Sequence, residues 1–157
     1  GSEMCIRDRL STSYRNNQII CNLANKMYPD MEPCDSAMNV KTEHDGIFWI
    51  EEKDIDNYME TYKPMQLRYD RRTKVNAKFR VMTFGSAKGL TFDRVLIYPT
   101  QPMLTWLSGK SKGLKGESLS KFYVAVTRAK YSVGFIYKTK KVPSEIIGIK
   151  WTPNIDE

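Results

Sequence analysis

Residues 79–98 have the sequence FRVMTFGSAKGLTFDRVLIY, and this stretch decides the fold of the chain. Residues 79–84 follow the two-residue alternation of a β-strand until Gly85 interrupts it. A second interruption at Gly89 is followed by the apolar run 95–98, which is typical of a strand covered on both faces. The stretch therefore predicts two strands joined by a turn that contains glycine.

The turn between these strands, residues 86–91, has a composition that suits contact with a phosphate group. Glycine lets the backbone approach a ligand closely, lysine supplies positive charge, and the hydroxyls of serine and threonine donate hydrogen bonds. The same residues also fit an ordinary β-turn with a solvated lysine. From the turn alone, this second interpretation is the stronger one.

Strand and helix patterns alternate on both sides of this stretch. Strand, helix and strand in this order predict an α/β fold with a mainly parallel sheet. From Lys138 onward the sequence has too little pattern to assign an element. The expected elements are strands at 10–14, 46–50, 65–69 and 131–137, helices at 16–27, 54–62 and 117–130, and a helical turn at 100–107.

Three residues lie at notable places in this pattern. Tyr14 and Arg15 are expected where the strand at 10–14 meets the helix at 16–27. Arg128 is expected on the outer side of the helix at 117–130, opposite its apolar stripe, so its guanidinium is not needed for packing. From the local pattern alone, we expect Tyr14 to pack in the protein interior and both Arg15 and Arg128 to be surface charges.

Length and composition narrow the class of protein. The 157 residues can bury one sizeable core, and a net charge of +7 favours polyanionic partners, although many soluble domains carry such an excess. Three cysteines without paired short spacings and a single histidine predict neither a disulfide framework nor a metal site. No apolar run reaches membrane-spanning length, so we expect a cytoplasmic protein without a membrane partner.

The segment GSAKGLTFDRVLI, which begins at Gly85, resembles motif V of the UvrD/Rep-type superfamily 1 DNA helicases, T-x-H-S-A-K-G-L-E-F-x-x-V. Two positions depart from that motif. Gly85 stands where the family often has a histidine along the single-stranded DNA track. Thr91 stands where it often has a glutamate that reaches the ribose of the nucleotide.

Two further segments resemble the same family. LSTSYRNNQIICNLAN, residues 10–25, is similar to motif IV, and FYVAVTRA, residues 122–129, is similar to motif VI. In the family, the tyrosine of motif IV stacks on adenine, and its arginine reaches the γ-phosphate. The resemblance implies these roles for Tyr14 and Arg15, and a second γ-phosphate contact for Arg128.

This resemblance implies a C-terminal RecA-like domain, with three layers and a mainly parallel sheet flanked by helices. We expect it over residues 9–140, after a tag or unassigned leader at 1–8 and before a tail at 141–157. The interval between motifs IV and V is too short for the large inserted domain of UvrD and Rep, so that domain is expected to be absent.

In these helicases, ATP lies between two RecA-like domains, of which the first holds the phosphates and Mg²⁺. The chain has no GxxxxGK[ST] loop, because position 104 is a leucine ahead of Gly109-Lys110-Ser111. The resemblance therefore implies that ATP and Mg²⁺ are held mainly by a missing N-terminal RecA-like domain. Arg15 and Arg128 are then the catalytic arginine fingers.

The same resemblance implies an ATP-dependent DNA helicase that translocates along and unwinds DNA, of which this fragment alone is inactive and monomeric. It assigns Tyr14, Gly89 and Thr91 to nucleotide binding, and it assigns the single-stranded DNA contacts to Thr83, Gly85, Ser86 and Lys88.

Three alternatives stay open. The chain could be a stand-alone module that binds nucleic acid or a partner without catalysis, or part of an RNA-directed helicase. The charged run 68–78 is most simply a solvated loop, and a DNA contact is its second interpretation.

Overall fold

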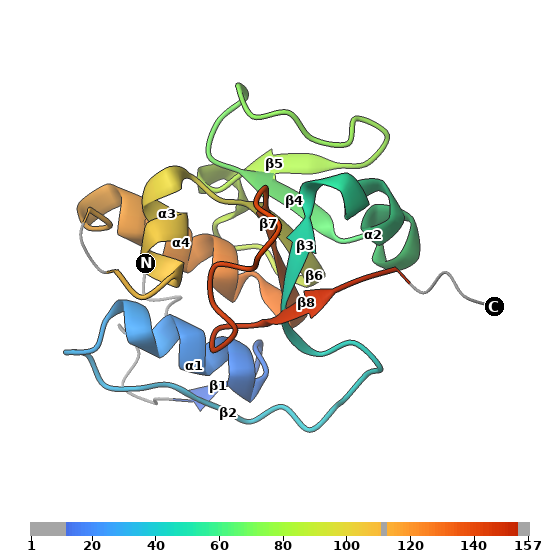
Figure 1. The fold of residues 1–157 in the computed structure, drawn as a ribbon. Helices are drawn as coiled ribbons and strands as arrows, with labels where there is room; N and C mark the ends of the chain where they lie inside the picture. The colour runs from blue at the N-terminus through green and yellow to red at the C-terminus, as the bar shows by residue number, and fades with distance from the viewer. Residues whose placement is uncertain (1–11, 111–112, 154–157) are drawn as a thin grey trace.

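The computed structural model describes residues 12–110 and 113–153. Over these residues, a six-stranded parallel sheet runs in the order β5–β4–β6–β7–β3–β8 (Figure 1). A short parallel pair, β1 (Thr12–Ser13) and β2 (Asp35–Ser36), lies apart from it. The strands of the sheet are β3 (Gly46–Glu51), β4 (Met65–Arg68), β5 (Val81–Thr83), β6 (Phe92–Tyr98), β7 (Ala129–Tyr137) and β8 (Ile149–Trp151).

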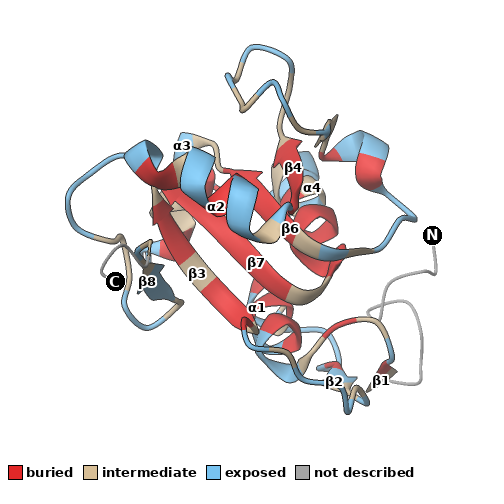
Figure 2. Cartoon of the chain, turned by 90° about the vertical axis from the view of Figure 1, so that its right-hand side faces the viewer, coloured by how far each residue is buried: buried red, intermediate tan, exposed pale blue. Residues whose placement is uncertain are grey.

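Helices cover both faces of this sheet. One face packs against α1 (Gln18–Met27), α3 (Gln101–Leu107) and α4 (Gly116–Thr127). The other face packs against α2 (Ile55–Tyr62), which follows the short 3₁₀ turn η2 (Glu52–Asp54). Figure 2 shows α2 lying over the buried strands. This three-layer α/β arrangement confirms the expected fold class.

The strand sequences explain why both faces are covered. In β3, Ile47 and Trp49 join the cluster beneath α1 and α4, whereas Ile50 points to the side of α2. Successive side chains of a strand point to opposite faces, so an apolar run supplies both layers. On the α2 side, Gly134 of β7 has no side chain, and this leaves room for the side chains of Ile50 and Tyr58. A Cβ atom on residue 134 would lie 2.7 Å from Ile50 Cδ1 and 3.5 Å from Tyr58 Cε2.

Local signals fix the helix ends. The Asn17 side chain accepts a hydrogen bond of 3.0 Å from the Ile20 N–H, so Asn17 caps α1, as one of the two predicted cap residues. Helix α2 stops at Lys63, which has a left-handed φ of 49° and precedes Pro64. Asn17 also ties the start of α1 to the sheet, because its main-chain N–H donates to the Lys130 oxygen at 3.2 Å and its Nδ2 donates to the Tyr131 oxygen at 2.7 Å.

Three expectations need correction. The helix predicted at 117–130 ends at Thr127, and Ala129 already belongs to β7. The unassigned tail contributes β8, which pairs with β3 and extends the sheet beyond residue 140. Cys34 is disulfide-bonded, whereas no disulfide framework was expected. Part of the strand predicted at 10–14 lies outside the described residues.

No helix within residues 12–110 or 113–153 is long and apolar enough to cross a membrane. In the same described ranges, no group of three or more histidine, cysteine, aspartate or glutamate side chains is arranged to hold a metal ion.

Candidate functional site

Asn16 ties the segment before α1 to the start of β7. Its side-chain Nδ2 donates hydrogen bonds to the main-chain oxygens of Thr127 and Ala129, at 2.9 and 2.7 Å. Asn16 is only 5% exposed, so water does not compete for these bonds. Because the two carbonyl groups flank residue 128, the arrangement places the backbone of Arg15 next to that of Arg128.

The end of motif V reaches the same corner. The main-chain N–H of Phe92 donates a hydrogen bond of 2.8 Å to the main-chain oxygen of Arg128, and Phe92 pairs in register with Ala129. Thr91 immediately precedes Phe92. All three motifs therefore meet at the amino-terminal ends of β6 and β7, and we call this place, with Arg15, Thr91 and Arg128, the arginine edge.

The pKa of the Tyr123 phenol is affected by both Arg15 and Arg128. Burial raises the pKa of its phenol to about 12, and the positive charges of Arg128 and Arg15 act in the opposite direction. Both guanidinium groups therefore lie close enough to affect one buried side chain of α4. Together with the Asn16 hydrogen bonds to the carbonyl groups on either side of Arg128, this places the two residues on one edge of the sheet.

Arg128 is not where helical periodicity placed it. Its side chain is 1% exposed, and Nη2 donates a hydrogen bond of 3.2 Å to Thr127 Oγ1. Since α4 ends at Thr127, Arg128 belongs to the tight passage from helix to strand and not to an outer helix face. The expectation of an exposed guanidinium was therefore wrong.

Tyr14 and Arg15 lie at the predicted junction between β1 and α1. Tyr14 is 76% exposed, so the interpretation as a packed tyrosine is wrong, and its side chain is open to solvent. Arg15 is half-buried. An exposed aromatic ring beside an accessible guanidinium suits a ligand that combines a planar base with phosphate.

The turn of motif V has a geometry that requires glycine. Lys88 has φ −58° and ψ 133°, Gly89 has φ +85°, and the Leu90 N–H donates to the Ala87 oxygen at 3.0 Å. These values define a type II turn with glycine at its third position. The turn leaves Lys88 and Gly89 exposed, while Ala87 is fully buried and anchors the turn.

The other end of motif V lies at the carboxyl end of β5. Thr83 Oγ1 donates to Ser86 Oγ at 2.9 Å, and the Ser86 N–H donates to Thr83 Oγ1 at 3.3 Å. Apart from neighbouring residues of its own turn, nothing lies within 4 Å of a Cβ built on Gly85, so the space beside that backbone is open. The structure thus brings Thr83, Gly85 and Ser86 together, away from the arginine edge.

The single histidine has a structural environment. The His44 ring stacks between Phe48 and Tyr62, with both centroid distances 3.8 Å, and its Nε2 lies 2.8 Å from the Tyr58 hydroxyl. Burial, together with the positive charge of Arg94, lowers the His44 pKa to about 4. The His44 ring is therefore neutral, and in this form it packs against Tyr58 and Tyr62 of α2.

Sequence reasoning missed the importance of Asn16, which was considered only as a helix cap. Its position between Arg15 and Asn17 within a polar run gives no sign of burial. The amide acquires its role from carbonyl groups more than a hundred residues away.

A model of the UvrD-like helicase C-terminal domain family matches residues 49–140. No curated protein matches the sequence. The methylated nsp10 helicase of PRRSV is 21% identical with a TM-score of 0.51, and the match covers 83% of this chain and 24% of that one. The C-terminal domain of a possible DNA helicase from Lactobacillus plantarum is 10% identical with a TM-score of 0.47, over 88% of this chain and 98% of that one.

Another arterivirus nsp10 helicase structure is 20% identical with a TM-score of 0.49, over 86% of this chain and 26% of that one. The chain thus spans about a quarter of the length of these viral helicases. At such low identity, the structural likeness concerns the fold alone.

Proposed function

Because the chain belongs to the UvrD-like helicase C-terminal domain family, we propose that it is the second RecA-like domain of an ATP-dependent DNA helicase. In this role it supplies arginines to ATP bound by an N-terminal RecA-like domain and grips single-stranded DNA. We propose residues 9–140 as the core of this domain, with β8 (Ile149–Trp151) as an added edge strand that pairs with β3.

The observation that carries this proposal is the arginine edge. The buried amide of Asn16 joins the segments of Arg15 and Arg128, which are far apart in the sequence. Arginine suits contact with a γ-phosphate because its planar fork makes bidentate, charge-assisted bonds and keeps its proton. Two guanidinium groups on one edge can contact the same phosphate group when a second domain brings it there.

The two arginines differ in how exposed their side chains are to a ligand. Arg15 is half-buried and can reach a ligand from its present position, whereas Arg128 is 1% exposed and must become accessible as the second domain approaches. Tyr14 stacks on the adenine base, and the backbone of Gly89 and Thr91 lies beside the sugar and phosphates. Mg²⁺ and the remaining phosphate contacts belong to the other domain.

The DNA contacts lie at the other end of motif V. Thr83 and Ser86 donate to backbone phosphates there, Lys88 continues these contacts from the type II turn, and the open space beside Gly85 admits the strand. Such contacts do not read the sequence, so binding weakens as the salt concentration rises. Because motif V connects both places, closure of the ATP cleft moves the DNA contacts with it.

The test uses the complete helicase, with a domain that carries the GxxxxGK[ST] loop. Arg128→Ala is expected to lower ATP turnover about a hundredfold or more, as for other arginine fingers. Arg15→Ala is expected to lower it with less risk to the fold, because Arg15 is partly exposed. Lys26→Ala, which removes an exposed charge from α1, is the control and leaves turnover unchanged.

Circular dichroism melting separates loss of chemistry from loss of structure. Normal turnover in folded Arg15→Ala and Arg128→Ala proteins would remove the roles proposed for both residues. Stimulation of the ATPase by single-stranded DNA but not by RNA is the expected substrate preference, and the reverse result would assign the motor to RNA.

A further inference from the structure

A pocket of about 850 Å³ opens at the carboxyl edge of the sheet, opposite the arginine edge. It is lined by the segments that follow β3, β6 and β7, including Glu52, Pro99 and Lys138. The chain leaves β6 toward α3 on one face and leaves β3 toward α2 on the other. Strand connections that diverge to opposite faces open a crevice, which is where parallel α/β sheets commonly bind ligands.

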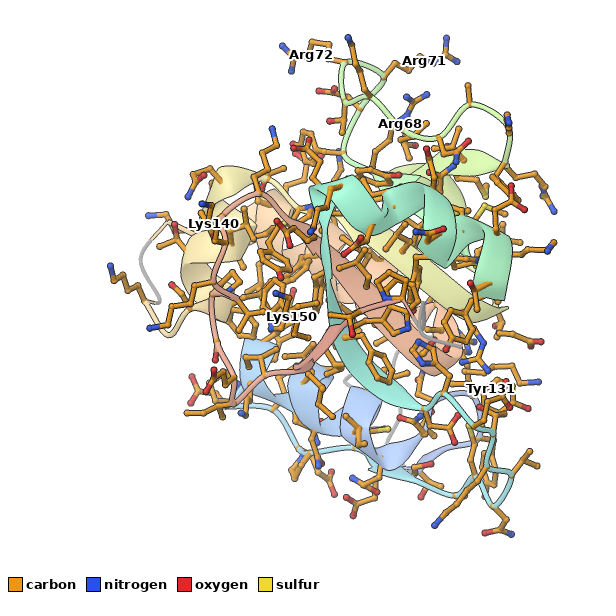
Figure 3. All side chains as sticks on the ribbon, turned by 45° about the vertical axis from the view of Figure 1, so that its right-hand side comes forward. Arg68, Arg71, Arg72, Tyr131, Lys140 and Lys150 are labelled. Atoms are coloured by element: carbon orange, nitrogen blue, oxygen red, sulfur yellow. The ribbon has the colours of Figure 1, made fainter. Side chains whose placement is uncertain are left out.

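The rim of this pocket is positively charged. Four cationic side chains and a single carboxylate, that of Glu52, line it. Arg72 and Asp70 both belong to the loop after β4, and Arg72 Nη2 forms an ion pair with Asp70 Oδ2 at 2.7 Å. Figure 3 shows Arg71 and Arg72 projecting from that loop, with Lys140 on the segment after β7. The cationic lining residues are Arg72, Lys74, Lys110 and Lys138.

This pocket lies on the same sheet edge as the polar end of motif V. Arg68, at the end of β4, pairs in register with Thr83 on one side and with Tyr98 on the other. Thr83 is therefore about 10 Å from Tyr98, two strand spacings along the edge. The Arg68 guanidinium also donates to the Thr73 oxygen at 2.9 Å, and both Thr73 and Tyr98 line the pocket.

We propose that this pocket binds the phosphate backbone of a single nucleic-acid strand, continuing the contacts made by Thr83 and Ser86. The inference rests on the proposed function, since it extends the DNA site of motif V along the edge. Its cations are exposed, so they can neutralise phosphates without a large desolvation cost. The apolar wall, which includes Ile55 and Leu104, offers a surface for a base.

The test measures binding of a fluorescent oligothymidylate to the 157-residue chain by anisotropy over a range of salt concentrations. The double variant Lys74→Ala with Lys138→Ala removes two rim charges. It is expected to bind about tenfold or more weakly at about 50 mM salt, with the slope of log affinity against log salt reduced by about 1.4. The matched control, Lys26→Ala with Lys41→Ala, removes the same charge at exposed lysines that do not line the pocket.

A third variant, Thr83→Ala with Ser86→Ala, separates the two sites. Weaker binding in this variant alone, with the pocket double variant equal to the control, overturns the pocket inference and leaves the proposed grip by motif V in place. Equal binding by wild type and pocket variant, or preferential binding of an acidic peptide, also overturns it. Absence of any oligonucleotide binding overturns both DNA sites, while the ATPase test of the arginines remains independent.

Discussion

Replacement of Asn16 by alanine tests the link that builds the arginine edge. The substitution removes two hydrogen bonds to the main-chain oxygens of Thr127 and Ala129, and a third that the side chain accepts from Ser13 at 3.0 Å. Each bond contributes about 1 kcal/mol, and the two buried carbonyl groups left without this donor add to the cost. We therefore expect Asn16→Ala to lower the free energy of unfolding by about 2–4 kcal/mol.

Urea unfolding monitored by circular dichroism measures the difference in unfolding free energy between the variant and the wild type. We expect the m-value to be unchanged. The matched control is Asn22→Ala on the exposed side of α1, where one bond of 2.9 Å from Gln18 is lost. We expect this control to change stability by less than about 0.5 kcal/mol. If Asn16→Ala were as stable as Asn22→Ala, the buried bridge between motifs IV and VI would not hold the edge together, and our reasoning would be refuted.

Two more predictions concern other parts of the fold. The pKa of His44 is about 4 in the folded chain and near 6.5 when unfolded, so its contribution to stability is complete above pH 6.5 and is lost as pH falls toward 4, by about 3 kcal/mol. His44→Gln should flatten this part of the stability curve, measured by urea unfolding between pH 4 and 7. Gly89→Ala should lower stability by about 1–2 kcal/mol, measured by thermal unfolding, because φ is +85° there.

Each of these predictions has a clear contrary result. An unchanged pH dependence in His44→Gln would show that groups other than His44 account for the acid sensitivity. Gly85→Ala is the control for Gly89→Ala, because Gly85 has no positive φ and open space around it. Equal effects of the two glycine substitutions would contradict the importance of the type II turn.

Local patterns predicted most of the fold because they act over short distances. The apolar run at 95–98 lies in β6, and the cap at Asn17 begins α1 as expected. Element ends were less certain: apolar periodicity continues from α4 into β7, so the pattern could not locate the change at Arg128. Strand β8 escaped prediction because it is only three residues long, too short for a clear alternation, and two of its residues are exposed.

The sequence by itself determined the family motifs, their order, and the strand–turn–strand unit around Gly89, since each depends on neighbouring residues. Only the tertiary structure decided that Arg15 and Arg128 share one edge, that Arg128 is buried, and that loops far apart in the chain enclose a cationic pocket. The physical reason is that contacts such as the Asn16 bridge join segments more than a hundred residues apart. No local pattern records a partner at that distance.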